Sequence, residues 1–317
     1  MSTWGPWFTK TYHHEPYAAL QNANTLSSAA GKVIIITGGG SGIGKAMAKA
    51  FSTTSAKAII LLGRTESRLL AVKTEIEHLQ HESGKATSQP PFARHPNEAR
   101  PSIYTYATDI ANEESVQTTF EKIKTNFSFI DVVVHCAGHL PDLHPFKAAT
   151  SNTSSLPAWW EGYRTNILGT AILLGQFLGC CAPEINSSSG SPTFINISSN
   201  LAHIPPFPGA SAYAPSKIAS VKLLEYIQAE NPHLRVFNVH PGLVTTEMSA
   251  KGDVVNEDSA ELPAYFCLWL LNPQADFLKG RMVWTNWDVA EMVDRREEIV
   301  RRNLLTTGLR GWDERCD

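Results

Sequence analysis

The sequence predicts an α/β protein in which helices cover both faces of one doubly wound, seven-stranded parallel sheet. From Lys32 onward, short β-branched runs alternate with amphipathic stretches, which is the pattern of successive strand–helix–strand units. The apolar runs are continuous rather than alternating, as expected for strands that are buried on both faces. The chain has 317 residues, 43% of them hydrophobic, and is long enough for one large domain of this kind.

The strands are expected where β-branched and aromatic residues cluster between turn residues. The seven runs are 33–36, 58–62, 103–106, 132–134, 193–197, 236–239 and 282–284. Helices are expected at the amphipathic stretches between these runs. They fall near 43–55, 66–81, 113–127, 157–182, 211–230 and 258–271. Strands and helices in this order make a single domain without a second core.

Three segments do not follow this alternation. Residues 1–30 show no sustained period, and we expect an arm in front of the domain at 31–287. Residues 82–101 are rich in Pro, Ser, Gly and charge, which indicates a surface insertion before the third strand. Residues 288–317 form a C-terminal extension, in which 288–303 is expected to be an amphipathic helix with a solvated charged face.

The composition excludes several classes of protein. The formal charge is 27 − 30 = −3, so the chain lacks the basic excess of a nucleic-acid-binding protein. The longest apolar stretch, 167–181, is shorter than the roughly 18 residues that a membrane span needs. The N-terminus has no basic region followed by an apolar one, so we expect a cytoplasmic protein without a secretory signal. The cysteines show no disulfide or ligand spacing, so we expect buried thiols and no metal site.

A glycine-rich loop, TGGGSGIG, follows the first expected strand and precedes the first helix. Glycines permit a tight turn there. They also let a pyrophosphate approach the backbone N–H groups of a helix N-terminus, whose dipole favours an anion. The loop therefore predicts a dinucleotide site. Its candidate contacts are Thr37, Gly38, Ser41, Gly42, Ile43 and Gly44.

Two further motifs carry chemistry. Tyr213 and Lys217 lie four residues apart in an expected helix and so share one face. A tyrosine, with a reference pKa of about 10, acts as an acid–base group near neutrality when a positive charge stabilises its phenolate. Ser198 and Ser199 end the fifth strand, at the edge of the sheet where open α/β proteins bind ligands. Because side chains alternate along a strand, one of these two serines is expected to face the site.

Taken in order, these motifs resemble the short-chain dehydrogenase/reductase family in its compact single-domain form, over about 32–246. The resemblance implies a Rossmann-like fold. It also implies a catalytic tetrad of Asn166, Ser199, Tyr213 and Lys217, with Ser199 preferred to Ser198 because its spacing to Tyr213 is nearer that of the family. Further implied cofactor contacts are Asp109, Ala137, Gly138, Tyr213, Lys217, Pro241, Gly242, Val244 and Thr246. The N-terminal arm and the Trp-rich C-terminal region are similar to fungal members, many of which act in secondary metabolism.

Two departures from the family pattern matter. The pair His135-Cys136 stands where the family has Asn-Asn, a segment that steadies the sheet and lines the cofactor. At the end of the second strand, where NAD-selective relatives carry a carboxylate, the chain has Arg64. A guanidinium grips a 2′-phosphate bidentately, so we expect NADP(H) to be favoured over NAD(H). Glu66 lies close by, and a solvated surface residue is the alternative interpretation of Arg64.

The resemblance implies an oxidoreductase that interconverts a ketone and a secondary alcohol on a mostly apolar small molecule. Tyr213 would exchange the proton, Ser199 would orient the substrate oxygen, and Lys217 would lower the Tyr213 pKa and hold the ribose hydroxyls. Asn166 would anchor a water that passes protons to Lys217. Two alternatives stay open: a redox-neutral isomerase, epimerase or cyclase that uses the same site, and a dinucleotide-binding regulator without turnover.

The substrate pocket is expected to draw on 139–150, 202–211 and 246–271. These segments supply Leu140, Phe146, Ile204, Phe207, Met248 and Phe266. The resemblance further implies a homodimer or homotetramer in which the 157–182 helix and the helix with Tyr213 pair with their copies. No nucleic-acid or membrane partner is expected.

Overall fold

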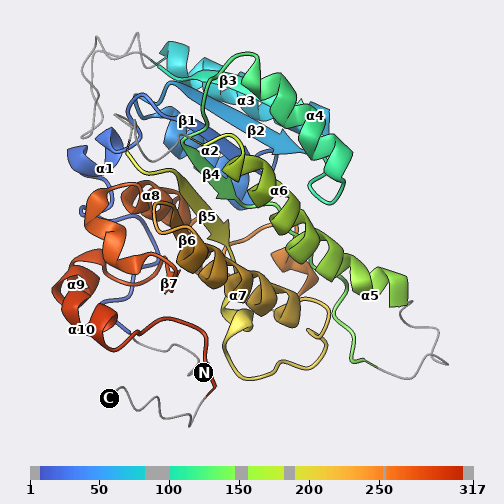
Figure 1. The fold of residues 1–317 in the computed structure, drawn as a ribbon, viewed down its shortest axis with the longest axis vertical. Coiled ribbons are helices and arrows are strands. Elements are labelled where there is room, and N and C mark those ends of the chain that lie inside the picture. Colours follow the sequence, from blue (N-terminus) through green and yellow to red (C-terminus); the bar gives the residue numbers. More distant parts are fainter. Residues whose placement is uncertain (1–7, 83–99, 147–155, 182–189, 253–254, 310–317) are drawn as a thin grey trace.

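The computed structural model describes residues 8–82, 100–146, 156–181, 190–252 and 255–309 (Figure 1). Within these ranges, seven strands form one parallel sheet in the order β3-β2-β1-β4-β5-β6-β7, which confirms the predicted fold class. The strands are β1 (Val33–Thr37), β2 (Ala58–Gly63), β3 (Ser102–Ala107), β4 (Val132–His135), β5 (Thr193–Ile197), β6 (Arg235–His240) and β7 (Met282–Trp284). Most of the predicted insertion at 82–101 lies outside the described residues.

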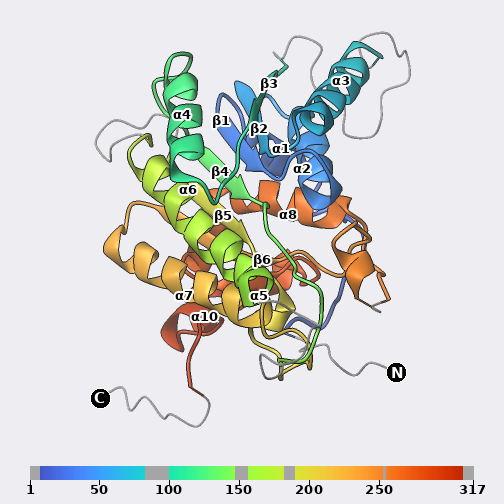
Figure 2. The ribbon, with the colours of Figure 1, turned by 90° about the vertical axis from the view of Figure 1, so that its right-hand side faces the viewer.

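Helices pack on both faces of the sheet, as the view in Figure 2 shows. One face carries α2 (Gly42–Ser52), α3 (Glu66–Glu82) and α8 (Glu261–Leu270). The other carries α4 (Glu113–Lys124), α6 (Gly169–Leu178) and α7 (Ala214–Glu230). The other helical segments of the described chain are α1 (Ala23–Ser27), α5 (Leu156–Tyr163), α9 (Val289–Asp294), α10 (Arg296–Arg301), the π-helix η1 (Arg164–Leu168) and the 3-10 helices η2 (Asn200–Ala202), η3 (Ser249–Lys251) and η4 (Pro273–Leu278). In the described ranges no helix is both long and apolar enough to cross a membrane.

Alternate residues of each central strand enter two separate apolar layers. In β1, Ile34 and Ile36 pack in the layer with α2, α3 and α8, while Ile35 packs in the layer with α4 and α6. All five residues of β1 are buried. Burying one such aliphatic side chain stabilises the fold by roughly 1.5–3 kcal/mol. Both faces are covered by helices, which is why the strand runs show no polar alternation.

The expected helix at 157–182 is wrong in one respect, because the π-helix η1 interrupts it between α5 and α6. Asn166 lies in this π turn. Its side chain holds the backbone of His139: Nδ2 donates to the carbonyl oxygen at 2.9 Å and Oδ1 accepts from the N–H at 2.8 Å. A π turn carries one extra residue, and such turns are frequent at functional sites.

The described part of the arm, 8–30, lies against the C-terminal extension. The His13 N–H donates to the Asn286 carbonyl at 2.8 Å, and His13 Nε2 lies 2.9 Å from Asp288 Oδ2. The Val289 N–H donates to the Tyr17 hydroxyl at 2.8 Å. The arm is therefore packed beside the end of β7 and the start of α9.

The expected single helix at 288–303 is also wrong, because α9 ends before Arg295 and α10 begins after it. Arg295 has φ −94° and ψ 7°, which are not helical values. Its guanidinium lies 3.9 Å from the centroid of the Phe8 ring. This contact with the arm accompanies the break and joins the extension to the arm.

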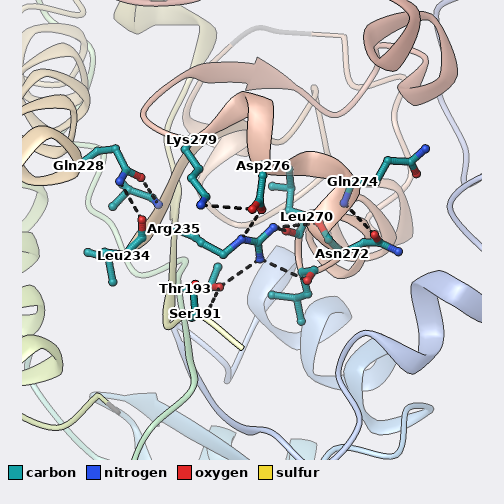
Figure 3. Close-up of polar contacts among 12 residues, drawn as sticks. Ser191, Thr193, Gln228, Leu234, Arg235, Leu270, Asn272, Gln274, Asp276 and Lys279 are labelled. Carbon is teal, nitrogen blue, oxygen red and sulfur yellow. Dashed lines mark hydrogen bonds and ion pairs between the residues drawn. The ribbon is translucent and has the colours of Figure 1, made fainter. Parts of the chain in front are cut away.

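A buried arginine supports the amino end of the sheet (Figure 3). Arg235 is the first residue of β6, and its side chain is 6% exposed. Its guanidinium donates to Asp276 Oδ1 at 2.7 Å and to the carbonyl oxygens that end α8. Those acceptors are Leu270 at 2.8 Å, Leu271 at 3.2 Å and Asn272 at 2.9 Å. The last carbonyls of a helix have no partner within the helix, so the arginine supplies one.

Candidate active site

The candidate site lies at the carboxyl ends of β1, β4 and β5. β1 and β4 are neighbours in the sheet, with Thr37 opposite His135, yet the chain continues from them to opposite sides of the sheet. This reversal leaves a crevice at the carboxyl edge, which is where open α/β sheets bind ligands.

The glycine loop joins β1 to α2 in a conformation that depends on glycine. Gly38 has a φ of +68° and Gly42 a φ of +49°, values that other residues rarely adopt. A methyl group on Gly44 would collide with the carbonyl oxygen of Gly38. Ser41 is the N-cap of α2, and its side chain makes no capping hydrogen bond. The loop thus has the close backbone and the helix N-terminus that a pyrophosphate needs, and the predicted contacts lie together in it.

Tyr213, Lys217 and Ser199 come together beside this loop. Tyr213 is the N-cap of α7 rather than a residue inside a helix, and Lys217 lies one turn later. The Lys217 ammonium is 5.7 Å from the centroid of the Tyr213 ring and donates to the carbonyl oxygen of Ile197 at 2.9 Å. Ser199, the N-cap of η2, lies two residues after the end of β5 and hydrogen-bonds Tyr213. A phenol, an ammonium and a hydroxyl therefore come together in one place.

Burial sets the protonation of this group. Burial raises the pKa of Tyr213 to about 12, although the hydrogen bond with Ser199 acts in the opposite direction. Burial lowers the pKa of Lys217 to about 8. Near neutral pH the tyrosine is consequently protonated and the lysine charged. Burial also raises the pKa of the neighbouring Cys136 to about 12, so that thiol stays protonated and is a poor nucleophile.

Asn166 enters the site from the π turn. Its Nδ2 also donates to Ser216 Oγ at 2.9 Å, and Ser216 Oγ donates to the Tyr213 carbonyl at 2.7 Å. A methyl group on Gly138 would lie 3.3 Å from both Asn166 Oδ1 and Lys217 Nζ. Asn166, Gly138 and Lys217 are thus brought into one place, as the motif order predicts.

The two adjacent serines differ in their surroundings. Ser199 is partly exposed, and its Oγ accepts from the Leu201 N–H at 3.3 Å. Ser198 is 3% exposed, and its Oγ has no hydrogen-bond partner among the described residues. Of the two serines, Ser199 is the one that hydrogen-bonds Tyr213 and lowers its pKa. This arrangement favours Ser199 over Ser198 as the serine that meets a substrate.

The segment after β6 completes the crevice. Gly242 has a φ of +85°, and a methyl group at Gly42 would lie 3.1 Å from the Thr246 methyl carbon. Val244 forms a bridge with Asp258. The Asp258 carboxylate, 3% exposed, accepts from the Leu243 N–H. The implied contacts at Pro241, Gly242, Val244 and Thr246 therefore lie in a segment that is tied to residue 258 and reaches the glycine loop.

Comparison with known proteins identifies the family. A sequence model of the short chain dehydrogenase family matches residues 32–254. The chain belongs to this family. Two curated relatives, the short chain dehydrogenases mpl6 of Monascus purpureus and citE of Monascus ruber, are each 30% identical over 311 residues, which cover 96% of both chains. As a short chain dehydrogenase, the protein is an oxidoreductase that acts on CH–OH or C=O groups with a nicotinamide dinucleotide.

Solved structures confirm the fold. A 7 alpha-hydroxysteroid dehydrogenase complexed with NADH and 7-oxo glycochenodeoxycholic acid is 20% identical, with a TM-score of 0.67 over 84% of this chain and 96% of the other. A short chain dehydrogenase of Burkholderia cenocepacia J2315 in complex with NADP is 19% identical, with a TM-score of 0.63 over 81% of this chain and 97% of the other.

Two predicted cofactor contacts of this short chain dehydrogenase lie at the outer strands. Arg64 directly follows β2 and is exposed. Asp109 follows β3, and its Oδ1 accepts from the Ala111 N–H at 3.0 Å. Sequence reasoning missed an ion pair between Arg68, on α3, and Glu247. In this pair Arg68 Nη1 lies 2.9 Å from Glu247 Oε2. No sequence signal marks this pair, because its partners are 179 residues apart.

One expected pocket residue is wrong. Phe266 is fully buried in the layer beneath α8, where its ring lies 5.7 Å from that of Trp269, so it lines the core and not the site. Phe146 and Phe207 are exposed, at 68% and 54%. An aromatic contact that no sequence pattern marks lies nearby: Trp159 Nε1 donates to Ser211 Oγ at 3.1 Å, two residues before Tyr213.

Proposed function

We propose that this short chain dehydrogenase is an NADP(H)-dependent oxidoreductase that interconverts a ketone and a secondary alcohol on a mostly apolar small molecule, with Tyr213 exchanging the proton. The observation that carries the proposal is the buried Tyr213, hydrogen-bonded to Ser199, with the Lys217 ammonium 5.7 Å from its ring. The glycine loop beside this group fits a dinucleotide because its backbone leaves no room for a side chain at Gly44.

The residues of the chain divide the work of proton transfer. When bound, the nicotinamide ring supplies the hydride chemistry. Ser199 donates a hydrogen bond to the substrate oxygen and orients it. Tyr213 is protonated near neutrality and gives its proton to that oxygen in the reductive direction. The charged Lys217 stabilises the phenolate that remains, and such acid–base catalysis typically contributes 10²–10⁴-fold.

Asn166 and the glycine loop hold the remaining parts. Asn166 lies with Lys217 around Gly138, where it anchors a water that returns a proton toward the lysine. Thr37, Ser41 and Ile43, with the loop glycines, would hold the pyrophosphate, and Asp109 and Ala137 would line the adenine and nicotinamide sides. Pro241, Val244 and Thr246 would hold the carboxamide of the nicotinamide.

The substitution Tyr213→Phe tests the acid–base role, because it keeps the ring and removes the proton. We expect turnover in a panel of ketones with NADPH to fall by about 10²-fold or more, while cofactor binding, followed by fluorescence, stays the same. Full turnover in the variant would refute the role of Tyr213. Product formation without any change in cofactor absorbance would instead support the redox-neutral isomerase.

Arg64 supports the preference for NADP(H). It is exposed directly after β2, where NAD-selective relatives carry a carboxylate, and a guanidinium there can grip a 2′-phosphate. We expect wild-type protein to bind NADPH more tightly than NADH. The variant Arg64→Glu should weaken NADPH binding by roughly 10–100-fold and leave NADH binding similar, because a charge-assisted hydrogen bond contributes about 1.5–3 kcal/mol. The exposed Arg296, on α10, gives the matched control Arg296→Glu, which should change neither affinity.

An aromatic wall beside Tyr213 supports an apolar substrate. The Tyr163 hydroxyl donates to the Ser211 carbonyl at 3.2 Å, and the Trp159 ring lies 4.7 Å from that of Tyr163 and 5.6 Å from that of Phe146. Such rings bury apolar surface and offer few polar partners. Apolar aryl or alicyclic ketones should therefore show a lower KM than charged 2-oxo acids in the same panel. The opposite order would contradict this substrate class.

The exposed surface of α6 and α7 supports a homodimer or homotetramer. Tyr226 is 61% exposed on α7, and Leu168, just before α6, is 49% exposed. In the part of the chain that the structure describes, nothing lies within 4 Å of a methyl group built on Gly175. Light scattering should give at least twice the 34.8 kDa of one chain, and a monomer would contradict this proposal.

A further inference from the structure

A buried polar chain connects the glycine loop to the π turn. Strand pairing sets Thr37, at the end of β1, opposite His135, at the end of β4. Helix α6 covers this position with Thr170, and η1 adds Asn166. All four residues are at most 2% exposed. Polar groups buried this deeply must satisfy one another, because water does not reach them.

Four hydrogen bonds link these groups in sequence. The Ala137 N–H donates to Thr37 Oγ1 at 2.9 Å, and Thr37 Oγ1 lies 2.9 Å from His135 Nδ1. On the other side of the ring, His135 Nε2 lies 3.0 Å from Thr170 Oγ1. Thr170 Oγ1 in turn donates to the Asn166 carbonyl oxygen at 2.7 Å.

The carbonyl end determines the direction of every bond. A carbonyl oxygen only accepts, so the Thr170 proton is committed to Asn166. Thr170 Oγ1 must then accept from His135, which places the ring proton on Nε2. Burial and the nearby Lys217 lower the His135 pKa to about 3, so the ring is neutral and Nδ1 has no proton. Nδ1 therefore accepts from Thr37, whose own oxygen accepts from Ala137.

We propose that His135, in its neutral Nε2–H form, is a positioning residue that fixes the cofactor loop and the Asn166 turn relative to each other. The proposal rests on the proposed function, because it concerns how two parts of that site are kept in register. Imidazole suits the task because its two nitrogens point in different directions, one toward β1 and one toward α6. The shorter amide that the family pattern would place here has less reach between the two partners.

The series of hydrogen bonds runs from Thr37 at one end to Asn166 at the other. Breaking it at each end should cause a different defect. Loss of the Thr170 hydroxyl frees the Asn166 turn but leaves Thr37 bound to His135. Thr170→Val should therefore lower kcat for ketone reduction by about tenfold, which is the effect expected from one lost hydrogen bond. It should change the NADPH affinity by less than about twofold. Thr170→Ser keeps the hydroxyl and should restore kcat. His135→Phe removes both links and should impair kcat and NADPH affinity together.

The experiment combines these kinetics with ¹⁵N-histidine NMR and thermal unfolding. We expect the His135 resonances to report a neutral Nε2–H ring from pH 6 to 9, assigned by their loss in His135→Asn. A proton on Nδ1 would overturn the proposal. So would a Thr170→Val variant that loses thermal stability but keeps wild-type kcat, since that is the signature of a merely structural role. If wild-type protein reduces no ketone, the proposed function fails, while the NMR and NADPH titrations still decide whether the link exists.

Discussion

Removing the Arg235 guanidinium tests how much one buried cation stabilises the sheet. Arg235→Met keeps most of the aliphatic stem of the side chain and deletes the charged head. The loss leaves the carbonyl oxygens of Leu270 and Leu271 without this donor, while the Asn272 carbonyl keeps the Ala275 N–H at 3.0 Å. Asp276 is 45% exposed, so its carboxylate returns to water and is not left as a buried charge.

The expected magnitude follows from these contacts. A buried carbonyl that loses its partner costs about 1–3 kcal/mol, and two are affected. Burying methionine avoids the desolvation of a guanidinium, which offsets part of that cost. We therefore expect the free energy of unfolding to fall by about 3 kcal/mol. For a chain of this size, that corresponds to a decrease in Tm of roughly 6 °C.

Urea unfolding followed by circular dichroism measures this change. Lys279→Met is the matched control, since Lys279 pairs with the same Asp276 at 3.2 Å from a more exposed position, and it should cost at most about 0.5 kcal/mol. NADPH affinity should be unchanged in both variants, because Arg235 lies at the amino end of β6 and the crevice lies at the carboxyl end. A loss below about 1 kcal/mol for Arg235→Met would refute the reasoning about the α8 carbonyls.

Three other perturbations have defined outcomes. The kcat/KM for ketone reduction should be flat below pH 8 and decline tenfold per pH unit above it. The reason is that Lys217, with its pKa lowered to about 8, loses the charge that supports Tyr213. A pH profile of the wild-type enzyme checks this. Gly44→Ala should abolish NADPH binding in a fluorescence titration, since its methyl group would collide with the Gly38 carbonyl. Retained binding would contradict the assignment of the glycine loop as the cofactor site. Asp258→Asn should weaken NADPH binding several-fold and lower Tm, because the Asp258 carboxylate holds the segment after β6. As a control, His14→Ala removes only the 45%-exposed histidine that pairs with Asp258, and it should have a smaller effect in both assays.

Periodicity and turn chemistry were enough to predict the sheet. The runs of β1, β5 and β6 are buried throughout, so the pattern in the sequence reflects their surroundings directly, whereas β3, at the edge of the sheet, is only partly buried. The glycine loop was equally predictable, because its backbone angles at Gly38 and Gly42 are ones that favour glycine. The gathering of Tyr213, Lys217 and Asn166 followed from motif order, since the strand ends of a parallel sheet meet at one edge.

The remaining features depend on contacts between distant residues. The π turn at Asn166 is stabilised by the backbone of His139, 27 residues away, and nothing in the local helical pattern indicates it. The break at Arg295 accompanies a contact with Phe8 at the other end of the chain. Phe266 lies in the segment 246–271 that is expected to line the pocket, but α8 turns its side chain toward the core.

The arm and the C-terminal extension pack together beside the edge strand β7, and this packing affects how the protein behaves in concentrated solution. β7 is an edge strand, and its Met282 N–H donates to the Leu305 carbonyl at 2.8 Å, while Tyr12 and Trp287 form an antiparallel bridge just beyond it. An edge with open N–H and C=O groups is a template on which another chain can add a strand. Here segments of the same chain occupy that template. Shortening the chain at either end would thus invite aggregation through β7.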